Sequence, residues 1–295
     1  MKAKRIVSIL LTGSMLLSLL PVSALATAPV FDAPAQTTAK KAAPLVQEAD
    51  ASRSTEEEAA TRSSRDLDAE NSTSDSFTID LNAGGMPESE GDYDHWFYSA
   101  NSTTLFLYDG TFTLQPSSDP EAASALQTDL DIYKDAEFNG GTVGGGTDNH
   151  GTISGGTFQG NVNNHKTISD GTFQGEVYNF RGTISNGTFQ GILHNDSGTI
   201  SGGTFEEAVE VDAASGAEAK IEGGTFEKGM TLMNDDASIT ISDGLFDGEV
   251  FTGICRFPLS ISGGLFTKAV DVSHVYNPTD LSITGGYFVS KPTVP

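Results

Sequence analysis

Two histidines have a spacing that could place them side by side. His150 and His165 are fifteen residues apart, which is also the interval of a sequence repeat, and His194 follows further along the chain. Imidazole nitrogens bind transition metals, but a metal site also needs a third ligand nearby and partners that orient the ligands. The sequence identifies no such third ligand. We therefore expect exposed turn histidines, with no metal and no other cofactor.

The 40 acidic residues provide many carboxylates but no recognisable catalytic pair. Glu206-Glu207 and Asp235-Asp236 are adjacent in sequence, so the members of each pair point apart on a strand or lie in a loop. Glycoside hydrolysis needs two carboxylates at a defined separation, and a polysaccharide lyase needs a basic residue beside its acidic cluster. Beyond residue 76 the basic residues do not fall in one column of the repeat; they are Lys134, Lys166, Arg181, Lys220, Lys228, Arg256, Lys268 and Lys291. We predict no catalytic residue and no enzyme.

The densest aromatic cluster surrounds the only tryptophan, and it comprises Tyr93, His95, Trp96 and Tyr98. Exposed aromatic rings stack on sugars, so these four residues are the candidate ligand contacts. The alternative is a structural cap, because a stack of repeats must cover its open first unit. We favour the cap.

Composition excludes several classes of protein. The 295 residues include 33 glycines and carry a formal charge of −24. So much Gly, Thr, Ser and Asn disfavours a compact helical protein. Nucleic acid is a poor partner for such an acidic chain, because phosphate binding needs clustered Lys and Arg. The single cysteine, Cys255, excludes a disulfide within the chain.

The first 76 residues predict export followed by a spacer. Lys2, Lys4 and Arg5 precede an apolar run over 6–20, and Ala24-Leu25-Ala26 supplies a cleavage site, so residues 1–26 are predicted to be a secretory signal peptide. Residues 27–76 contain almost no aromatic residues, and such a stretch cannot offset its ordering entropy. We predict a disordered leader there. No later segment is apolar enough to cross a bilayer.

A short repeat organises the remainder of the chain. The phrase Ile-Ser-Gly-Gly-Thr-Phe occurs intact at 153–158 and 200–205, with variants throughout. Its aromatic position recurs at intervals of 15 to 22 residues, in a column of Phe158, Phe173, Phe189, Phe205, Phe226, Phe246, Phe266 and Phe288. An aliphatic residue stands five positions earlier in each unit. Fixed apolar columns in units too short to fold alone predict a solenoid.

The units predict β structure. Each contains short segments of alternating polarity separated by glycine-rich corners, without room for a helix. Two residues after the Ile column come Gly, Asp or Asn, which tolerate a left-handed backbone, so we expect Asp170 and Asp243 to be turn residues there. We predict an all-β protein: a parallel β-solenoid, or right-handed β-helix, with about nine coils over residues 138–290. Residues 77–137 form an N-terminal cap, and residues 291–295 are a tail.

A second column is polar. Asn149, Asn164, Asn179 and Asn195 share one offset in consecutive units, so their amides should hydrogen-bond along the axis as an inward asparagine ladder. The ladder ends where the intervals lengthen from 16 to about 20 residues, and apolar residues replace it. We therefore expect the coils to widen toward the C-terminus.

The repeated Ile-Ser-Gly-Gly-Thr-Phe and the terminal 283–290 segment resemble the GGTF-type repeats of secreted surface proteins from Gram-positive gut bacteria. The resemblance covers roughly residues 100–290 and implies a right-handed parallel β-helix, or pectate-lyase-like, domain. It specifies the fold much better than the function.

These observations predict a secreted structural or adhesive solenoid at the cell exterior. It would be a monomer that binds glycans or host or cell-surface proteins through its rod surface, with no nucleic-acid partner and no membrane insertion after cleavage. The alternative is a carbohydrate-binding or carbohydrate-active β-helix, of the polysaccharide lyase or glycoside hydrolase type. A third class is an ice-binding solenoid, because outward Thr and Ser form a regular array at Thr152-x-Ser154, Thr167-x-Ser169, Thr183-x-Ser185 and Thr199-x-Ser201. Strand faces favour Thr regardless of ligand, which weakens that interpretation.

Overall fold

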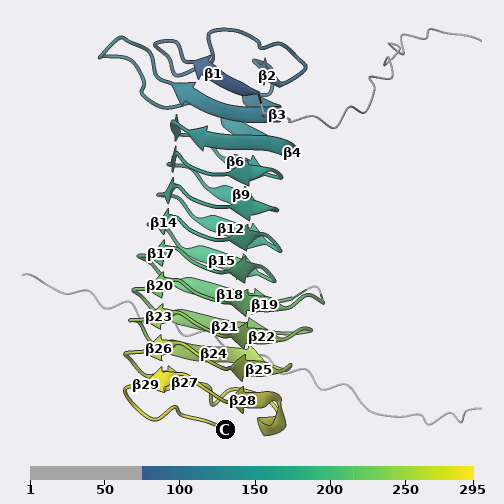
Figure 1. Cartoon of the computed structure of the whole chain (residues 1–295), viewed down its shortest axis with the longest axis vertical. Helices are drawn as coiled ribbons and strands as arrows, with labels where there is room; N and C mark the ends of the chain where they lie inside the picture. The colour runs from purple at the N-terminus through teal and green to yellow at the C-terminus, as the bar shows by residue number, and fades with distance from the viewer. Residues whose placement is uncertain (1–74, 215) are drawn as a thin grey trace, which may run out of the picture. The chain divides into compact units, whose positions relative to one another are not determined.

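The computed structural model describes residues 75–214 and 216–295 (Figure 1). The predicted signal peptide lies outside the described residues, as does the predicted leader apart from its last two positions. The described part is an all-β, parallel solenoid, as the repeats predicted. Its coils follow one another along the axis with the regular strands of a right-handed β-helix.

Each coil contributes one short strand to each of three faces. The first face contains β6 (Thr147–Asn149), β9 (Val162–Asn164), β12 (Val177–Phe180), β15 (Leu193–Asp196), β18 (Val209–Ala213), β21 (Met230–Asn234), β24 (Val250–Cys255) and β27 (Val270–Asp271). The second contains β7 (Thr152–Ile153), β10 (Thr167–Ile168), β13 (Thr183–Ile184), β16 (Thr199–Ile200), β19 (Ala219–Ile221), β22 (Ile239–Ile241), β25 (Leu259–Ile261) and β28 (Leu281–Ile283). The third is a nine-stranded sheet of β5 (Thr142–Val143), β8 (Thr157–Phe158), β11 (Thr172–Phe173), β14 (Thr188–Phe189), β17 (Thr204–Phe205), β20 (Thr225–Phe226), β23 (Leu245–Phe246), β26 (Leu265–Phe266) and β29 (Tyr287–Phe288). A 3-10 turn, η1 (Pro278–Asp280), precedes β28.

The N-terminal strands cover the first coils. β1 (Ser76–Asp80) runs parallel to β3 (Thr104–Gln115), and β2 (Trp96–Ser99) pairs antiparallel with the start of β3. β3 also pairs with β4 (Asp129–Gly140), which then pairs with both β6 and β7. The predicted boundary at residue 138 therefore falls within β4, where cap and coils form one continuous sheet. None of the described residues belongs to a helix long and apolar enough to cross a bilayer.

A stack of phenylalanine rings fills the interior along the third face. From Phe158 to Phe288 the rings of successive coils lie 4.4–5.1 Å apart between centroids and nearly parallel. Their register is fixed by strand pairing, in which each Phe aligns with the Phe of the next coil. All are fully buried except Phe288, which is partly buried. The predicted aromatic column is thus the spine of the core.

In the corner before this column, the left-handed residue lies one position later than the sequence predicted. The left-handed backbone lies at the second residue of each Gly-Gly, Asp-Gly or Asn-Gly pair, for example at Gly203 with φ 104°. A Cβ at Gly203 would stand 3.1 Å from the carbonyl oxygen of Gly187, so the position needs glycine for both backbone and space. The preceding residue stabilises the turn: Asp170 and Asp243 each accept a hydrogen bond from the next backbone N–H at 2.8 Å.

The four asparagines form a buried ladder beneath the first face. Nδ2 of Asn149 donates to Oδ1 of Asn164 at 2.7 Å, Asn164 donates to Asn179 at 2.6 Å, and Asn179 donates to Asn195 at 2.6 Å. At the end of the ladder, Nδ2 of Asn195 donates to the carbonyl oxygen of Gly198. A Cβ at Gly198 would lie 2.1 Å from Nδ2 of Asn179, so glycine there leaves the room the ladder needs.

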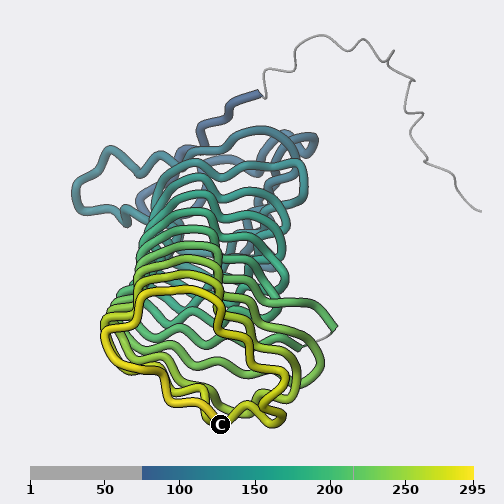
Figure 2. Tube along the Cα trace, turned by 60° about the horizontal axis from the view of Figure 1, so that its bottom comes forward, coloured from purple at the N-terminus to yellow at the C-terminus, as the bar shows by residue number. Residues whose placement is uncertain are grey.

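The coils widen after the ladder ends, as predicted, and the wider coils are visible in Figure 2. Asn195 pairs in register with Val211, which pairs with Leu232. Strands of the first face lengthen to five or six residues in β18, β21 and β24. Ile239 and Leu259 add new buried positions on the second face. A wider coil can therefore enclose an apolar interior where the narrow coils use amides.

Truncation of a central ring tests the phenylalanine stack. We expect Phe189→Ala to lower the free energy of unfolding by about 3–5 kcal/mol, because the ring is fully buried and stacks on rings above and below. Phe251→Ala is the control, since that ring is 45% exposed and should cost less than about 1 kcal/mol. Chemical denaturation measures both. Equal, small changes would contradict the stack.

A central amide should matter more than the last one. Asn179→Leu removes the acceptor for the Asn164 amide and the donor to the Asn195 oxygen, at about 1–3 kcal/mol for each orphaned group. Asn195→Val should cost less, because valine already stands at this position in the next coil and Nδ2 of Asn179 keeps the carbonyl oxygen of Gly182. Urea denaturation of both variants compares them. The reverse order of stabilities would exclude the ladder as a stabilising element.

Candidate functional site: an aromatic stripe on the first face

The strands that bury the asparagine ladder turn their alternate side chains outward. In β12, Val177 and Asn179 point inward, while Tyr178 and Phe180 point away from the core. Because the strands stack in register, outward side chains of successive coils form continuous columns. Two adjacent columns on this face, with their continuation over β2, β3 and β4, carry the rings that we call the aromatic stripe: Tyr93, Phe97, Phe106, Tyr108, Tyr133, His150, His165, Tyr178, Phe180 and His194.

The upper half of the stripe lies over the cap. The Phe97 ring lies 4.6 Å from Tyr93 and 6.2 Å from Phe106 between centroids. Tyr133 then lies 6.5 Å from Phe106 and 5.0 Å from Tyr108. Tyr93 and Tyr133 are 60% and 45% exposed, respectively. The cap therefore presents stacked rings to solvent as well as covering the core.

The lower half continues down the narrow coils. Pairing of Ile132 with Asn149 places Tyr133 and His150 in consecutive positions of one column. His150 stacks on His165 at 4.5 Å, and His165 lies 5.2 Å from Phe180. In the neighbouring column Tyr178 stacks on His194 at 4.6 Å. The stripe thus runs from the cap to β15.

Carboxylates border the rings. The phenol of Tyr178 donates to Glu176 at 2.6 Å, and His194 contacts Glu210 at 3.1 Å. A cavity of about 230 Å³ beside the stripe is lined by Asp129, Asp131 and Asp148 together with Asn161 and Asn163. Burial raises the pKa of Asp131, and the charges of Asp148 and Asp129 raise it further. A second cavity of about 210 Å³ lies between Tyr178, His194 and Asp212.

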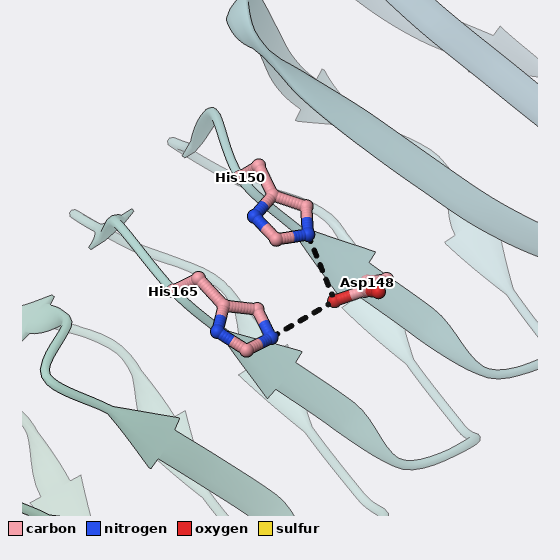
Figure 3. Close-up of side chains that lie close together, drawn as sticks. All are labelled: Asp148, His150 and His165. Atoms are coloured by element: carbon pink, nitrogen blue, oxygen red, sulfur yellow. Dashed lines mark ion pairs between the residues drawn. The ribbon is translucent and has the colours of Figure 1, made fainter.

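The two histidines meet a carboxylate in the middle of the stripe. Oδ1 of Asp148 lies 3.6 Å from Nε2 of His150 and 3.2 Å from Nε2 of His165, and both rings turn this nitrogen toward it (Figure 3). One ligand atom from each of the three residues lies within 4.8 Å of the others. Asp148 and His150 come from β6 and the residue after it, and His165 follows β9. The structure therefore places beside the two histidines a carboxylate that could serve as a third ligand, which the sequence did not identify.

The four candidate contacts from the sequence divide between cap and stripe. Trp96 and Tyr98 pair with Leu107 and Leu105, the buried positions of β3, and pack against the core. Both rings are partly buried, which is the structural role that the sequence favoured. Tyr93 joins the stripe. His95 lies against Phe77, with ring centroids 4.6 Å apart and tilted planes, so it supports the cap from beside the stripe.

Sequence reasoning missed most of the stripe. Phe97 lies between Trp96 and Tyr98 and pairs with Phe106, so the segment itself contained one ring of the stripe. Along the coils, the signal was the pair of positions that flank each ladder asparagine. These positions hold Asp148 and His150, then Asn163 and His165, then Tyr178 and Phe180, then His194 and Asp196.

Two other candidate features have structural partners. The serines of the Thr-x-Ser array point their hydroxyls at the preceding coil, where Ser169 donates to the carbonyl oxygen of Ile153 at 3.2 Å and Ser185 and Ser201 make similar bonds. Cys255 is fully buried, and burial raises its pKa to about 11. A protonated, buried thiol is a poor nucleophile.

Comparisons with known proteins found no relative of this chain. No family model, curated protein or solved structure matches the chain. The function must therefore be argued from the chain's own residues.

Asp92 fixes the loop that presents Tyr93 and Phe97. Its carboxylate accepts hydrogen bonds from the backbone N–H groups of Asp94, His95 and Trp96 and contacts Nδ1 of His95 at 2.8 Å. Desolvation opposes ionisation, but the bonds from His95 and Trp96 outweigh it and lower the pKa of Asp92 to about 2. The same side-chain bond raises the pKa of His95.

This pKa predicts an acid-dependent cap. Because the pKa of Asp92 is depressed in the folded state, its stabilisation is present above the ordinary value near 3.8 and is lost as the pH falls toward 2. Asp92→Ala should move the acid transition reported by Trp96, the only tryptophan, to higher pH. Asp94→Ala is the control and should leave it in place. An unchanged midpoint in Asp92→Ala would show that the carboxylate does not hold the loop.

Proposed function

We propose that this chain is an exported, glycan-binding solenoid that holds a polysaccharide against the aromatic stripe. The observation that carries the proposal is the succession of outward rings on one face. Ring contacts join Tyr93 to Tyr133 and His150 to His194, and strand register places Tyr133 next to His150. Aromatic rings pack on the apolar faces of sugars. Coils repeat at ~4.8 Å, which is close to the length of one sugar unit in an extended chain. A linear glycan can therefore meet a ring at successive units.

Charge selects the class of glycan. The chain carries −24 overall, and the stripe is bordered by Asp131, Asp148, Glu176 and Glu210. Such a surface repels anionic polymers such as uronates and favours neutral or amino-sugar glycans. The carboxylates also supply acceptors for sugar hydroxyls, which stacking alone leaves unsatisfied.

The N-terminal segments and the repeats also support a proposal for where the protein acts and what it binds. The basic, apolar and Ala-x-Ala segments over 1–26 support export, and the resemblance to GGTF-type repeats supports the surface of a Gram-positive bacterium. We propose a structural or adhesive role as a monomer, with an extracellular glycan as the partner. Nucleic acid is not a partner on this proposal, since the stripe is acidic.

The second candidate is a carbohydrate-active enzyme. Asp131 and Asp148 are register partners on β4 and β6, and burial together with the neighbouring carboxylates raises the pKa of Asp131. Acid–base cleavage of a glycosidic bond uses two carboxyls, one of which must donate a proton, and a raised pKa favours the proton-bearing form. Turnover of a bound glycan, abolished by Asp131→Asn, would favour this second function over binding alone.

Ring removal tests the binding proposal. On an array of neutral and amino-sugar oligosaccharides, followed by calorimetry with the best ligand, we expect Tyr133→Ala and Phe180→Ala each to weaken binding by about tenfold. The estimate corresponds to roughly 1.4 kcal/mol for one lost stacking contact. Both rings are outward and exposed, so the variants should fold normally.

The matched control is Tyr287→Ala, which removes a 67% exposed ring on the third face, away from the stripe. It should leave affinity unchanged. If no neutral or amino-sugar glycan binds, or if all three variants bind equally well, the stripe is not a glycan site. Saturable binding of a protein that also depends on Tyr133 would assign the stripe to a protein partner instead.

A further inference from the structure

We infer that Asp148, His150 and His165 form a binding site for a late first-row divalent metal such as Zn²⁺. Neutral imidazoles and one carboxylate are a donor set that this class of metal prefers, whereas Ca²⁺ and Mg²⁺ prefer oxygen alone. The inference concerns binding of the ion itself and stands independently of the glycan proposal.

The distances suit a shared ion. A tetrahedral metal bound at roughly 2.1 Å keeps its donor atoms about 3.4 Å apart. Oδ1 of Asp148 stands 3.2 Å from Nε2 of His165 and 3.6 Å from Nε2 of His150, and both rings turn their Nε2 toward it (Figure 3). The three donors already lie within 4.8 Å of one another. The side chain of His150 is 54% exposed, so its ring can rotate and bring Nε2 to the distance from the other two donor atoms that a shared ion needs.

The carboxylate has an unfilled bonding position. Oδ1 of Asp148 is buried, yet it accepts no hydrogen bond from any residue that the structure describes. A buried polar atom of this kind normally has a partner, and an ion is one of the partners that can supply it. The nearby His nitrogens face this atom at contact distance without donating to it. A cation between the three atoms would satisfy all of them together.

The surroundings favour a cation and give binding a structural effect. Asp131, the register partner of Asp148 on β4, and Asp129 line the adjoining cavity and add negative charge. The ligands also come from consecutive coils, since His150 follows β6 and His165 follows β9. A bound metal would link these coils from outside, opposite the Asn149–Asn164 bond that links them from inside. Metal binding should therefore raise the melting temperature.

Calorimetric titration of the full chain with Zn²⁺, after removal of metals by a chelator, tests the site. We expect one saturable site, and His150→Ala, His165→Ala and Asp148→Asn should each weaken it at least tenfold. His194→Ala is the matched control, because His194 also stacks on a ring and contacts a carboxylate, yet lies outside the cluster. Its affinity should equal that of the unaltered chain.

Two further measurements make the result decisive. Without metal, the three site variants should still fold, because their side chains point outward, and each then has its own baseline melting temperature. Addition of Zn²⁺ should raise the melting temperature of the unaltered chain and leave that of each variant at its baseline. Co²⁺ should give visible absorption bands that the histidine variants lack. Absence of saturable Zn²⁺ binding, equal loss in His194→Ala, or binding of Ca²⁺ alone without dependence on the histidines would each overturn the assignment.

Discussion

The in-register pairing of backbone between coils is the constraint on which the rest of this molecule depends. Each strand hydrogen-bonds to its counterpart one coil away, and the pairings place like residues on like: Phe173 on Phe189, Ile168 on Ile184, Asn179 on Asn195. Identical side chains can stack only if this register holds at every corner. The left-handed glycine two residues before each aromatic residue keeps it, because L residues rarely adopt a positive φ.

The same alternation builds the interior and the surface. A strand of three or four residues sends every second side chain inward, so the positions on either side of a ladder asparagine face solvent. Asn179 bonds along the axis inside, while outside Tyr178 stacks on His194 of the next coil and Phe180 on His165 of the preceding coil. Core and candidate site are therefore two products of one register. A slip of one residue would exchange them.

The interior could be predicted from the sequence because the repeat displays it directly: an inward column accepts few residue types, so Phe, Ile and Asn recur. The stripe could not be predicted in the same way. Its columns mix Asp148, Asn163, Tyr178 and His194, since an outward position tolerates almost any side chain. Trp96 shows the opposite case: its residue type also allowed a ligand contact, but strand alternation turns the ring toward Leu107, in the cap role that the sequence favoured. The sequence analysis also placed the left-handed residue of each corner one position too early, because Gly, Asp and Asn suit both positions of such a turn.

The ladder and the stripe end at the same coil, and the width of the coil explains why. A coil of 15 or 16 residues encloses little apolar volume, so the narrow section depends on amide bonds inside and gains further contact area from stacked rings outside. At β18 the coil lengthens, Val211 replaces the asparagine, and Glu210 and Asp212 take the outward positions beside it. The wider coils bury Val211, Leu232 and Ile239 instead and no longer need either device. Outward stacking thus belongs to the part of the solenoid with the smallest core, where rings that can meet a ligand also hold consecutive coils together.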